Sequence, residues 1–204
     1  MAYYYYLVAQ LPCLVYGQAL PMLPEAFIGL AKPQLNNHDA ALLDMVSLDP
    51  PPPPSVSGEP SVSASLAHKE KVPASGSGFI DGWREWEWTL RLNLAKERAH
   101  KNKREGGVMA NPPVIPTDAA VLAHKVITTI ESPLEAEMML DRARWDIIIE
   151  LQGNDFFDRN TVFAYLLKLF ILQRHSLFQT EAGFSEYKSL YTSILEKAES
   201  GGRI

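Results

Sequence analysis

The longest apolar pattern in the chain lies at 160–178 and reads NTVFAYLLKLFILQRHSLF. Between Val162 and Leu172 only Lys168 is charged, and apolar residues fall on every side of a helix. A helix that is apolar all round is buried on most of its faces. As a helix, the apolar residues from Val162 to Leu172 rise only about 16 Å, which is too short for a bilayer core of about 30 Å. The pattern predicts a mainly α fold, a helical bundle around a central apolar helix at about 160–178.

A second helix has both of its ends marked in the sequence. The letters SPLE at 132–135 place Ser at the N-cap, Pro at the first helical position and Glu at the third, as in a capping box. Apolar and small residues at helical spacing follow to about 152, and Gly153 is expected to end the helix. Asp158 or Asn160 is expected to cap the central helix that follows.

A tryptophan-rich helix is predicted at 78–105, with Asp81 as a plausible N-cap. Its apolar stripe at helical spacing consists of Trp83, Trp86, Leu90 and Leu94. Trp88 lies off this stripe, so we expect it to contact another helix or a partner protein. Because aromatic residues are enriched among interface hot spots, Trp88 is the interface candidate of the sequence.

The N-terminal segment, 1–48, begins with an aromatic and apolar run at 3–8. The composition of this run favours a strand, whereas its length does not distinguish a strand from a helix. The run either packs on the core as the first element of the fold or forms an aromatic binding patch, and we favour the first interpretation. Short helices are expected at 25–31 and 38–46, and the whole segment is predicted to pack on the bundle.

A proline- and serine-rich insertion at 49–78 separates this segment from the rest of the chain. Five consecutive prolines lead into a tract of Ser, Gly, Pro and Ala. Such a composition cannot bury enough apolar surface to offset the entropy lost on ordering. We therefore predict a disordered or extended linker that can be deleted. Residues 79–200 are predicted to form the bundle domain, with further helices at 117–130 and 185–199.

Two arginines of the tryptophan-rich helix, Arg91 and Arg98, lie among its apolar positions. On a partly buried face, a guanidinium group suits a carboxylate because its planar fork binds both oxygens. The candidate acids on the 134–152 helix are Asp141 and Asp146. We therefore predict structural ion pairs that join Arg91 and Arg98 to Asp141 or Asp146.

Composition and motifs give no indication of chemistry. The net charge of −5 provides no general attraction to nucleic acid or anionic lipid. The single cysteine and five histidines form no metal-binding motif, and no GxGxxG or GxxxxGK[ST] sequence occurs. We expect no catalytic, cofactor-binding or metal-binding residues and no small-molecule substrate. The first Lys or Arg is Lys32, so the positive start of a signal peptide is absent and a cytoplasmic location is expected.

Two other functions stay open on the sequence. A helical hydrolase or transferase would need polar groups that meet only in three dimensions. The basic residues between Lys96 and Arg104 are also typical of a nucleic-acid patch. Lys101, Lys103 and Arg104 fall at the end of a predicted helix, where cations suit the helix dipole, and we favour that interpretation.

Three stretches together resemble a known family. They are YYYLVAQLP at 4–12, WREWEWTLRLNLAKERA at 83–99, and SPLEAEMMLDRARWDIIIEL at 132–151 with FAYLLKLFIL at 163–172. The chain resembles a bacterial family of unknown molecular function whose genes accompany those of V-type (archaeal-type) ATP synthase subunits. That family is remotely similar to the C subunit of the rotary ATPase, a central-stalk protein.

The resemblance implies an all-helical protein that does no chemistry itself. The central-stalk protein to which the family is similar sits on the cytoplasmic end of the membrane rotor ring. There it forms a socket for the central shaft and couples torque during proton or sodium transport. By this resemblance the chain is expected to be a non-enzymatic accessory or central-stalk component. Its partners would be V-type ATPase subunits, and it would be cytoplasmic or peripheral to the membrane through the ATPase. The resemblance brings no catalytic residues with it.

Overall fold

Helices make up most of the structure. The computed structural model describes residues 3–50, 75–101, 117–178 and Tyr191 of the 204-residue chain. Within these ranges the chain is mainly helical, which confirms the predicted fold class. The helices are α1 (Tyr5–Ala9), α2 (Pro24–Ala31), the 3-10 helix η1 (Lys32–Gln34), α3 (Asn37–Leu43), α5 (Gly78–Lys101), α6 (Thr117–Thr129), α7 (Pro133–Gln152) and α8 (Arg159–Leu177).

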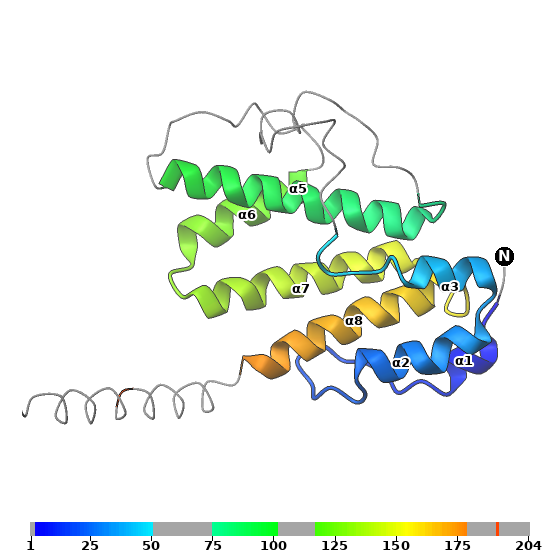
Figure 1. Cartoon of the computed structure of the whole chain (residues 1–204). Helices are drawn as coiled ribbons and strands as arrows, with labels where there is room; N and C mark the ends of the chain where they lie inside the picture. Colours follow the sequence, from blue (N-terminus) through cyan, green and yellow to red (C-terminus); the bar gives the residue numbers. More distant parts are fainter. Residues whose placement is uncertain (1–2, 51–74, 102–116, 179–190, 192–204) are drawn as a thin grey trace, which may run out of the picture.

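Helix α8 is the central helix that the apolar pattern predicts. It runs antiparallel to α7 and also packs against α2, while α5 and α6 lie on the other side of α7 (Figure 1). Lys168, the one charge within the apolar stretch, is half-buried and donates a hydrogen bond of 3.0 Å to the side chain of Gln152 on α7. The buried side chains of α8 are Thr161, Val162, Phe163, Ala164, Leu166, Leu167, Leu169, Ile171 and Leu172.

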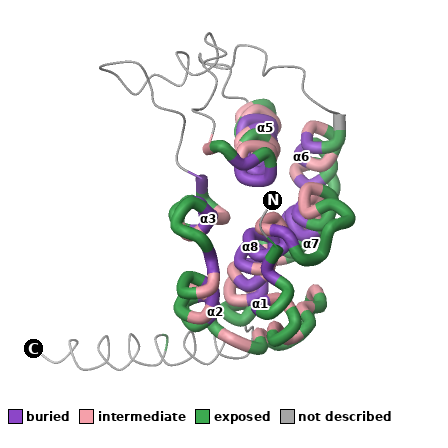
Figure 2. Tube along the Cα trace, turned by 90° about the vertical axis from the view of Figure 1, so that its right-hand side faces the viewer, coloured by how far each residue is buried: buried purple, intermediate pink, exposed green. Residues whose placement is uncertain are grey.

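Two hydrophobic clusters hold the helices together. The larger cluster joins α8 to α1, α2, α3, the first turns of α5 and the second half of α7. The smaller cluster lies between α5, α6 and α7 and consists of Leu90, Leu94, Ala119, Ala123, Val126 and Leu140. Trp86 packs against both clusters, so the predicted tryptophan stripe connects them. The buried sides of α5, α7 and α8 accordingly face one another (Figure 2).

Local side-chain bonds fix the ends of the long helices. Ser132 caps α7 by accepting the backbone N–H of Glu135 at 3.4 Å, and Gly153 ends that helix with a φ of 73°. Asp158 caps α8 by accepting the N–H of Thr161 at 3.0 Å. The predicted cap at Asp81 is wrong, because α5 already begins at Gly78 and Asp81 lies in its first turn.

The first segment of the chain is a helix instead of the strand that its composition favours. Tyr3 makes only an isolated antiparallel bridge to Asp158, and α1 then begins at Tyr5. The buried residues are Tyr4 and Leu7, which are three positions apart, as on one face of a helix. A strand needs a neighbouring strand for its backbone bonds, and none is present in the described ranges.

Both ends of the predicted insertion lie within the described residues. Residues 51–74, which contain most of the predicted linker, and most of the predicted helix at 185–199 lie outside the described residues. Ser77, by contrast, is fully buried and its carbonyl accepts the N–H of Asp81 at 3.0 Å at the start of α5. The backbone N–H of Ser75 also donates to the side chain of Asp81 at 2.9 Å, so Ser75 and Ser77 both contact the first turn of α5. Among the described helices, none is both long and apolar enough to cross a membrane.

Candidate functional site

A buried network of charges joins α5, α7 and α8. The carboxylate of Glu87 on α5 is fully buried and accepts two hydrogen bonds of 3.0 Å from the guanidinium group of Arg144 on α7. Arg144 also donates to Asp141 at 2.9 Å, one turn earlier on α7. Arg174 on α8 donates to the other oxygen of Asp141 at 3.1 Å. Two acids and two arginines thus connect three helices.

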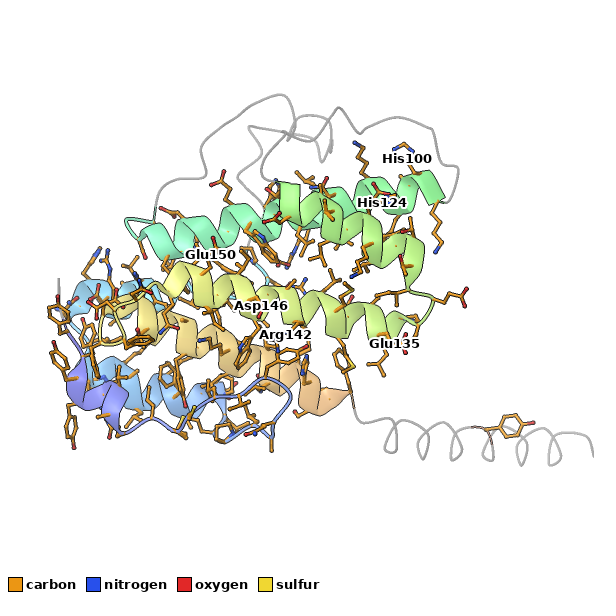
Figure 3. All side chains as sticks on the ribbon, turned by 180° about the vertical axis from the view of Figure 1, so that it is seen from behind. His100, His124, Glu135, Arg142, Asp146 and Glu150 are labelled. Carbon is orange, nitrogen blue, oxygen red and sulfur yellow. The ribbon has the colours of Figure 1, made fainter. Side chains whose placement is uncertain are left out.

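The predicted pairing of Arg91 and Arg98 with Asp141 or Asp146 is wrong. Arg91 binds Glu87 of its own helix at 2.9 Å and also Asp49, whereas Arg98 is exposed and makes no ion pair within the described residues. Asp146 is exposed and pairs with Arg142 at 3.3 Å on the outer face of α7 (Figure 3).

Asp141 is buried and ion-paired, as predicted for an acid of α7, but its partners are Arg144 and Arg174. The pair that joins α5 to α7 has the opposite arrangement from the prediction, with the acid on α5 and the arginine on α7. Glu87 lies three positions before Leu90 and seven before Leu94, so helical periodicity puts it on the buried face of α5. Arg144 follows Asp141 by three positions and faces the same way. This i, i+3 spacing of an acid and an arginine is the signal in the sequence that identifies both residues as neighbours on one face.

His175 closes the network at its α8 end. Its Nε2 atom lies 3.2 Å from Asp141 Oδ2, and its ring packs edge-on against Tyr16 with centroids 5.0 Å apart. Burial lowers the pKa of His175, and the neighbouring charge of Arg174 lowers it further, so the ring is neutral at pH 7. Guanidinium nitrogens already contact both oxygens of the Asp141 and Glu87 carboxylates. We conclude that this network has a structural role in joining the three helices.

A shallow depression of about 320 Å³ lies between the ends of α5 and α6. Its lining residues are Glu97, His100, Lys101, Ile127 and Thr128. Glu97 is bound at 3.1 Å by His124, and Lys101 donates to the carbonyl of Ile127 at 3.0 Å, so both charges have partners. Across the described ranges, no three His, Cys, Asp or Glu side chains are grouped to hold a metal ion. Lys103 and Arg104 of the basic run lie outside the described residues.

At one end of the molecule α1, α3 and the α7–α8 loop meet (Figure 1), and several aromatic side chains of α1 and of this loop are exposed there. We call this group the N-terminal aromatic surface and define it by Tyr3, Tyr5, Tyr6, Phe156 and Phe157. Their exposed fractions are 51%, 56%, 77%, 62% and 38%, respectively. The rings of Tyr3 and Tyr5 stack with centroids 5.6 Å apart, and Tyr5 lies 4.7 Å from Phe157. Two segments from opposite parts of the sequence thus form one surface.

The N-terminal aromatic surface stands on a fixed support. The backbone N–H of Tyr4 donates to the carbonyl of Phe157 at 2.7 Å, and the Tyr4 hydroxyl donates to Asp39 of α3 at 2.5 Å. Asn36, the cap of α3, donates to the same hydroxyl at 2.9 Å. Burial and the hydrogen bond to Asp39 raise the pKa of Tyr4 to about 12, so this hydroxyl keeps its proton at neutral pH. Buried Tyr4 thereby fixes its exposed neighbours.

The sequence interpretations of the aromatic residues are each correct in part. Tyr4 and Leu7 pack in the core, as favoured, while Tyr3, Tyr5 and Tyr6 are exposed, as the alternative of a binding patch requires. Phe156 and Phe157 were not predicted, although two adjacent phenylalanines in a Gly- and Asp-containing loop are a usable signal. Trp88 is half-buried and belongs to neither hydrophobic cluster, so its interface role stays a prediction.

Comparisons with known proteins give no relatives. No protein-family model matches the chain, and neither the curated proteins nor the solved structures contain a match.

Proposed function

We propose that the protein acts by protein–protein contact, without catalysing a reaction, and that the N-terminal aromatic surface is its docking site. The observation that carries this proposal is the group of five exposed aromatic side chains on a fixed support. At roughly 200 Å² of surface per aromatic side chain, their exposed fractions amount to about 600 Å². That is as large as the largest apolar patch of a typical monomer, and such patches often bind partners.

The resemblance supplies the identity of the partner in this proposal. The first of the three matched stretches, at 4–12, contains Tyr5 and Tyr6 of the N-terminal aromatic surface. We therefore assign the protein as an accessory or central-stalk component that docks on the cytoplasmic part of a V-type ATPase. Its attachment to the membrane would be through that complex. The proposal includes no cofactor, nucleic acid or small-molecule substrate.

Co-purification of a tagged copy from native membranes tests this function. The wild type and the control Val121→Ala, which alters an exposed apolar residue of α6, are expected to recover ATPase subunits. The double variant Tyr5→Ala/Tyr6→Ala is expected to lose them, because truncating an aromatic hot spot costs about 2 kcal/mol or more. If the wild type recovers no ATPase subunit in mild detergent and low salt, the proposed function is wrong. Loss in Trp88→Ala with full recovery in the tyrosine variant would place the docking site on α5.

The alternative, a helical hydrolase or transferase, has its best location in the depression between α5 and α6. Glu97, His100 and His124 lie at or beside it and include an acid and two possible bases. A panel of ester, amide and phosphoester substrates with the wild type and Glu97→Gln tests this function. Turnover by the wild type that Glu97→Gln abolishes would favour the enzyme.

A further inference from the structure

We propose that the N-terminal aromatic surface recognises a partner segment in which Arg or Lys side chains alternate with apolar ones. This inference rests on the proposed function, because it names the chemistry of the partner at the same surface. The occupant is a segment of another protein, and neither a lipid membrane nor a second copy of this chain. Three observations carry the inference: the continuity of the rings, the sign of the nearby charge and the size of the surface.

The rings form a continuous row. Tyr3 and Tyr5 lie with their planes at 22° to each other, and Tyr5 and Phe157 lie at 39° with centroids 4.7 Å apart. Tyr6 and Phe156 are the chain neighbours of Tyr5 and Phe157 and are the most exposed of the five aromatic residues. The electron-rich faces of such rings attract cationic groups, Arg more often than Lys, while their edges pack against apolar side chains. A partner that presents both kinds of side chain uses both properties of the row.

The charge around the rings is negative. The exposed carboxylate of Asp155 lies two positions before Phe157 and accepts the N–H of that residue at 3.1 Å. The two segments that build the surface, 3–9 and 153–158, contain no Lys or Arg. Arg159, which follows them, is engaged with Asp39 at 3.4 Å and with the carbonyl of Gly76 at 3.4 Å. The surface therefore offers an acceptor to a cation and no cation of its own.

A lipid membrane fits this surface poorly. Proteins that dock on anionic leaflets surround their apolar residues with Lys and Arg, because each cation near the lipid headgroups adds to the attraction. The two segments of this surface instead carry Asp155 and Asp158. Contact with an anionic membrane would bring like charges together.

A second copy of the chain also fits poorly. A stable protein interface buries about 800 Å² on each partner, more than the roughly 600 Å² of aromatic surface available here. In a two-fold dimer the same patch meets itself, so the Asp155 carboxylates of both copies would enter one interface. A short basic and apolar segment of a different protein avoids this repulsion, since its cations face Asp155.

Two designed peptides test the recognition directly. Both are amphipathic, of about 18 residues so that they can form a helix, and share one Leu pattern; one carries Arg and the other Glu at the polar positions. Binding to the full-length protein is measured by fluorescence anisotropy and by amide chemical shifts. We expect the Leu/Arg peptide to bind at least tenfold more tightly, with shift changes concentrated at 3–9 and 153–158. The preference should shrink as salt is raised.

Three variants locate the effect. Tyr5→Ala/Tyr6→Ala should weaken the Leu/Arg peptide tenfold or more, because it removes two exposed rings. Asp155→Asn should reduce severalfold the preference of the protein for the Leu/Arg peptide over the Leu/Glu peptide. The contribution of the shared Leu residues to binding should remain. Val121→Ala should bind like the wild type. Because Tyr5, Tyr6, Asp155 and Val121 are all exposed, circular dichroism should show unchanged helicity in each variant.

The inference is wrong if both peptides bind equally, if the tyrosine variant binds the Leu/Arg peptide like the wild type, or if neither peptide binds. It is also wrong if the tyrosines are instead required for binding to phosphatidylcholine–phosphatidylserine vesicles or for dimerisation seen by sedimentation. These results are distinguishable from failure of the proposed function. Peptide selectivity without recovery of ATPase subunits would leave the recognition chemistry in place and change the partner. Tyrosine-dependent recovery of the ATPase without peptide selectivity would support the proposed partner and contradict the proposed recognition chemistry.

Discussion

Glu87 and Arg144 are opposite charges on two helices, both removed from water. A buried ion pair adds little net stability compared with apolar residues, but removing one partner leaves the other charge buried and unpaired. Arg144 also holds Asp141, so its loss affects two carboxylates. At the scale of single residues, this arrangement makes the folded state sensitive to any change that breaks the network.

We expect Arg144→Ala to lower the free energy of unfolding by about 3–5 kcal/mol, as measured by urea denaturation. Two exposed charges that the sequence placed in the network serve as controls. Arg98→Ala and Asp146→Ala should each change the free energy of unfolding by less than about 1 kcal/mol, because exposed charges and surface ion pairs contribute little to stability. Equal effects of Arg144→Ala and Arg98→Ala would show that the network does not stabilise the fold.

Tyr4 gives the protein a predictable response to alkaline pH. Its pKa is about 12 in the folded protein, against an ordinary value of 10 for an unfolded tyrosine. Because the pKa is raised on folding, the protonated Tyr4 hydroxyl contributes its full stabilisation below pH 10. This contribution is lost as the pH rises toward 12. Tyr165, whose hydroxyl donates to the carbonyl of Pro12 at 3.0 Å, has its pKa raised to about 12 by burial and acts in the same direction.

The measurement is the free energy of unfolding between about pH 8 and pH 12 in the wild type and in Tyr4→Phe. The wild type should lose stability more steeply above pH 10 than the variant, which has no Tyr4 hydroxyl to deprotonate. The variant starts from lower stability at neutral pH, since Asp39 loses a hydrogen bond. Parallel curves for the two proteins would contradict the role given to Tyr4.

At the scale of elements, α8 depends on its N-terminal cap. Asp158 is buried and its carboxylate accepts the N–H of Thr161 at 3.0 Å, while its backbone bridges to Tyr3. Asp158→Ala should lower the free energy of unfolding by about 1–2 kcal/mol, the upper part of the range for N-caps. Ser132→Ala at the start of α7 is the matched control. Its cap bond is longer, at 3.4 Å, and more exposed, so we expect a smaller loss.

Denaturant titration of both variants checks this order. A larger loss of stability in Ser132→Ala than in Asp158→Ala would show that burial does not determine how much these caps stabilise their helices. An effect near zero at both positions would show that tertiary packing alone holds the helix ends.

The long helices could be predicted because their signals are local. The SPLE sequence at 132–135, Gly153 and the apolar run of α8 each specify a helix without reference to distant residues. The start of α5 at Gly78 agrees with the predicted range, but the predicted N-cap at Asp81 is wrong. Asp81 is a good cap residue by type, whereas Ser77, one turn earlier, lies in a stretch of linker composition. The burial of Ser77 in the structure shows that this residue belongs to the packed start of α5.

The charge network and the aromatic surface depend on contacts that the sequence does not contain. An arginine and an acid on two helices were expected to meet, but which helix carries which sign depends on the rotation of α5 and α7 about their axes. Phe157 reaches Tyr5 because the α7–α8 loop folds back on α1, which no local pattern indicates. Short aromatic runs such as 3–8 are ambiguous, because strand preference and helical spacing compete in them.

At the scale of the whole molecule, the two ends of the insertion are fixed to the bundle. Arg91 binds the carbonyl of Leu48 at 3.1 Å and also the side chain of Asp49, and Arg159 donates to Gly76. Replacing residues 51–74 by a Gly-Ser linker should therefore leave the helical content unchanged and the Tm within a few degrees. Extending the replacement through Ser77 should lower the Tm, because α5 loses the buried residue that precedes it.

Circular dichroism on heating both proteins distinguishes these results. A cooperative loss of helicity after replacement of 51–74 alone would show that the segment is part of the folded structure. Equal Tm values for the two replacements would show that Ser75–Ser77 do not support α5.

We propose that the N-terminal aromatic surface contacts the cytoplasmic part of a V-type ATPase. The most direct test of this contact is photo-crosslinking in intact cells, with a photoreactive phenylalanine analogue at position 6 or, as a control, at position 121. Tyr6 is 77% exposed within the surface, and Val121 is 60% exposed on α6. We expect a covalent adduct with an ATPase subunit from position 6 and none from position 121. No ATPase adduct from position 6, or equal adducts from both positions, would contradict this proposal.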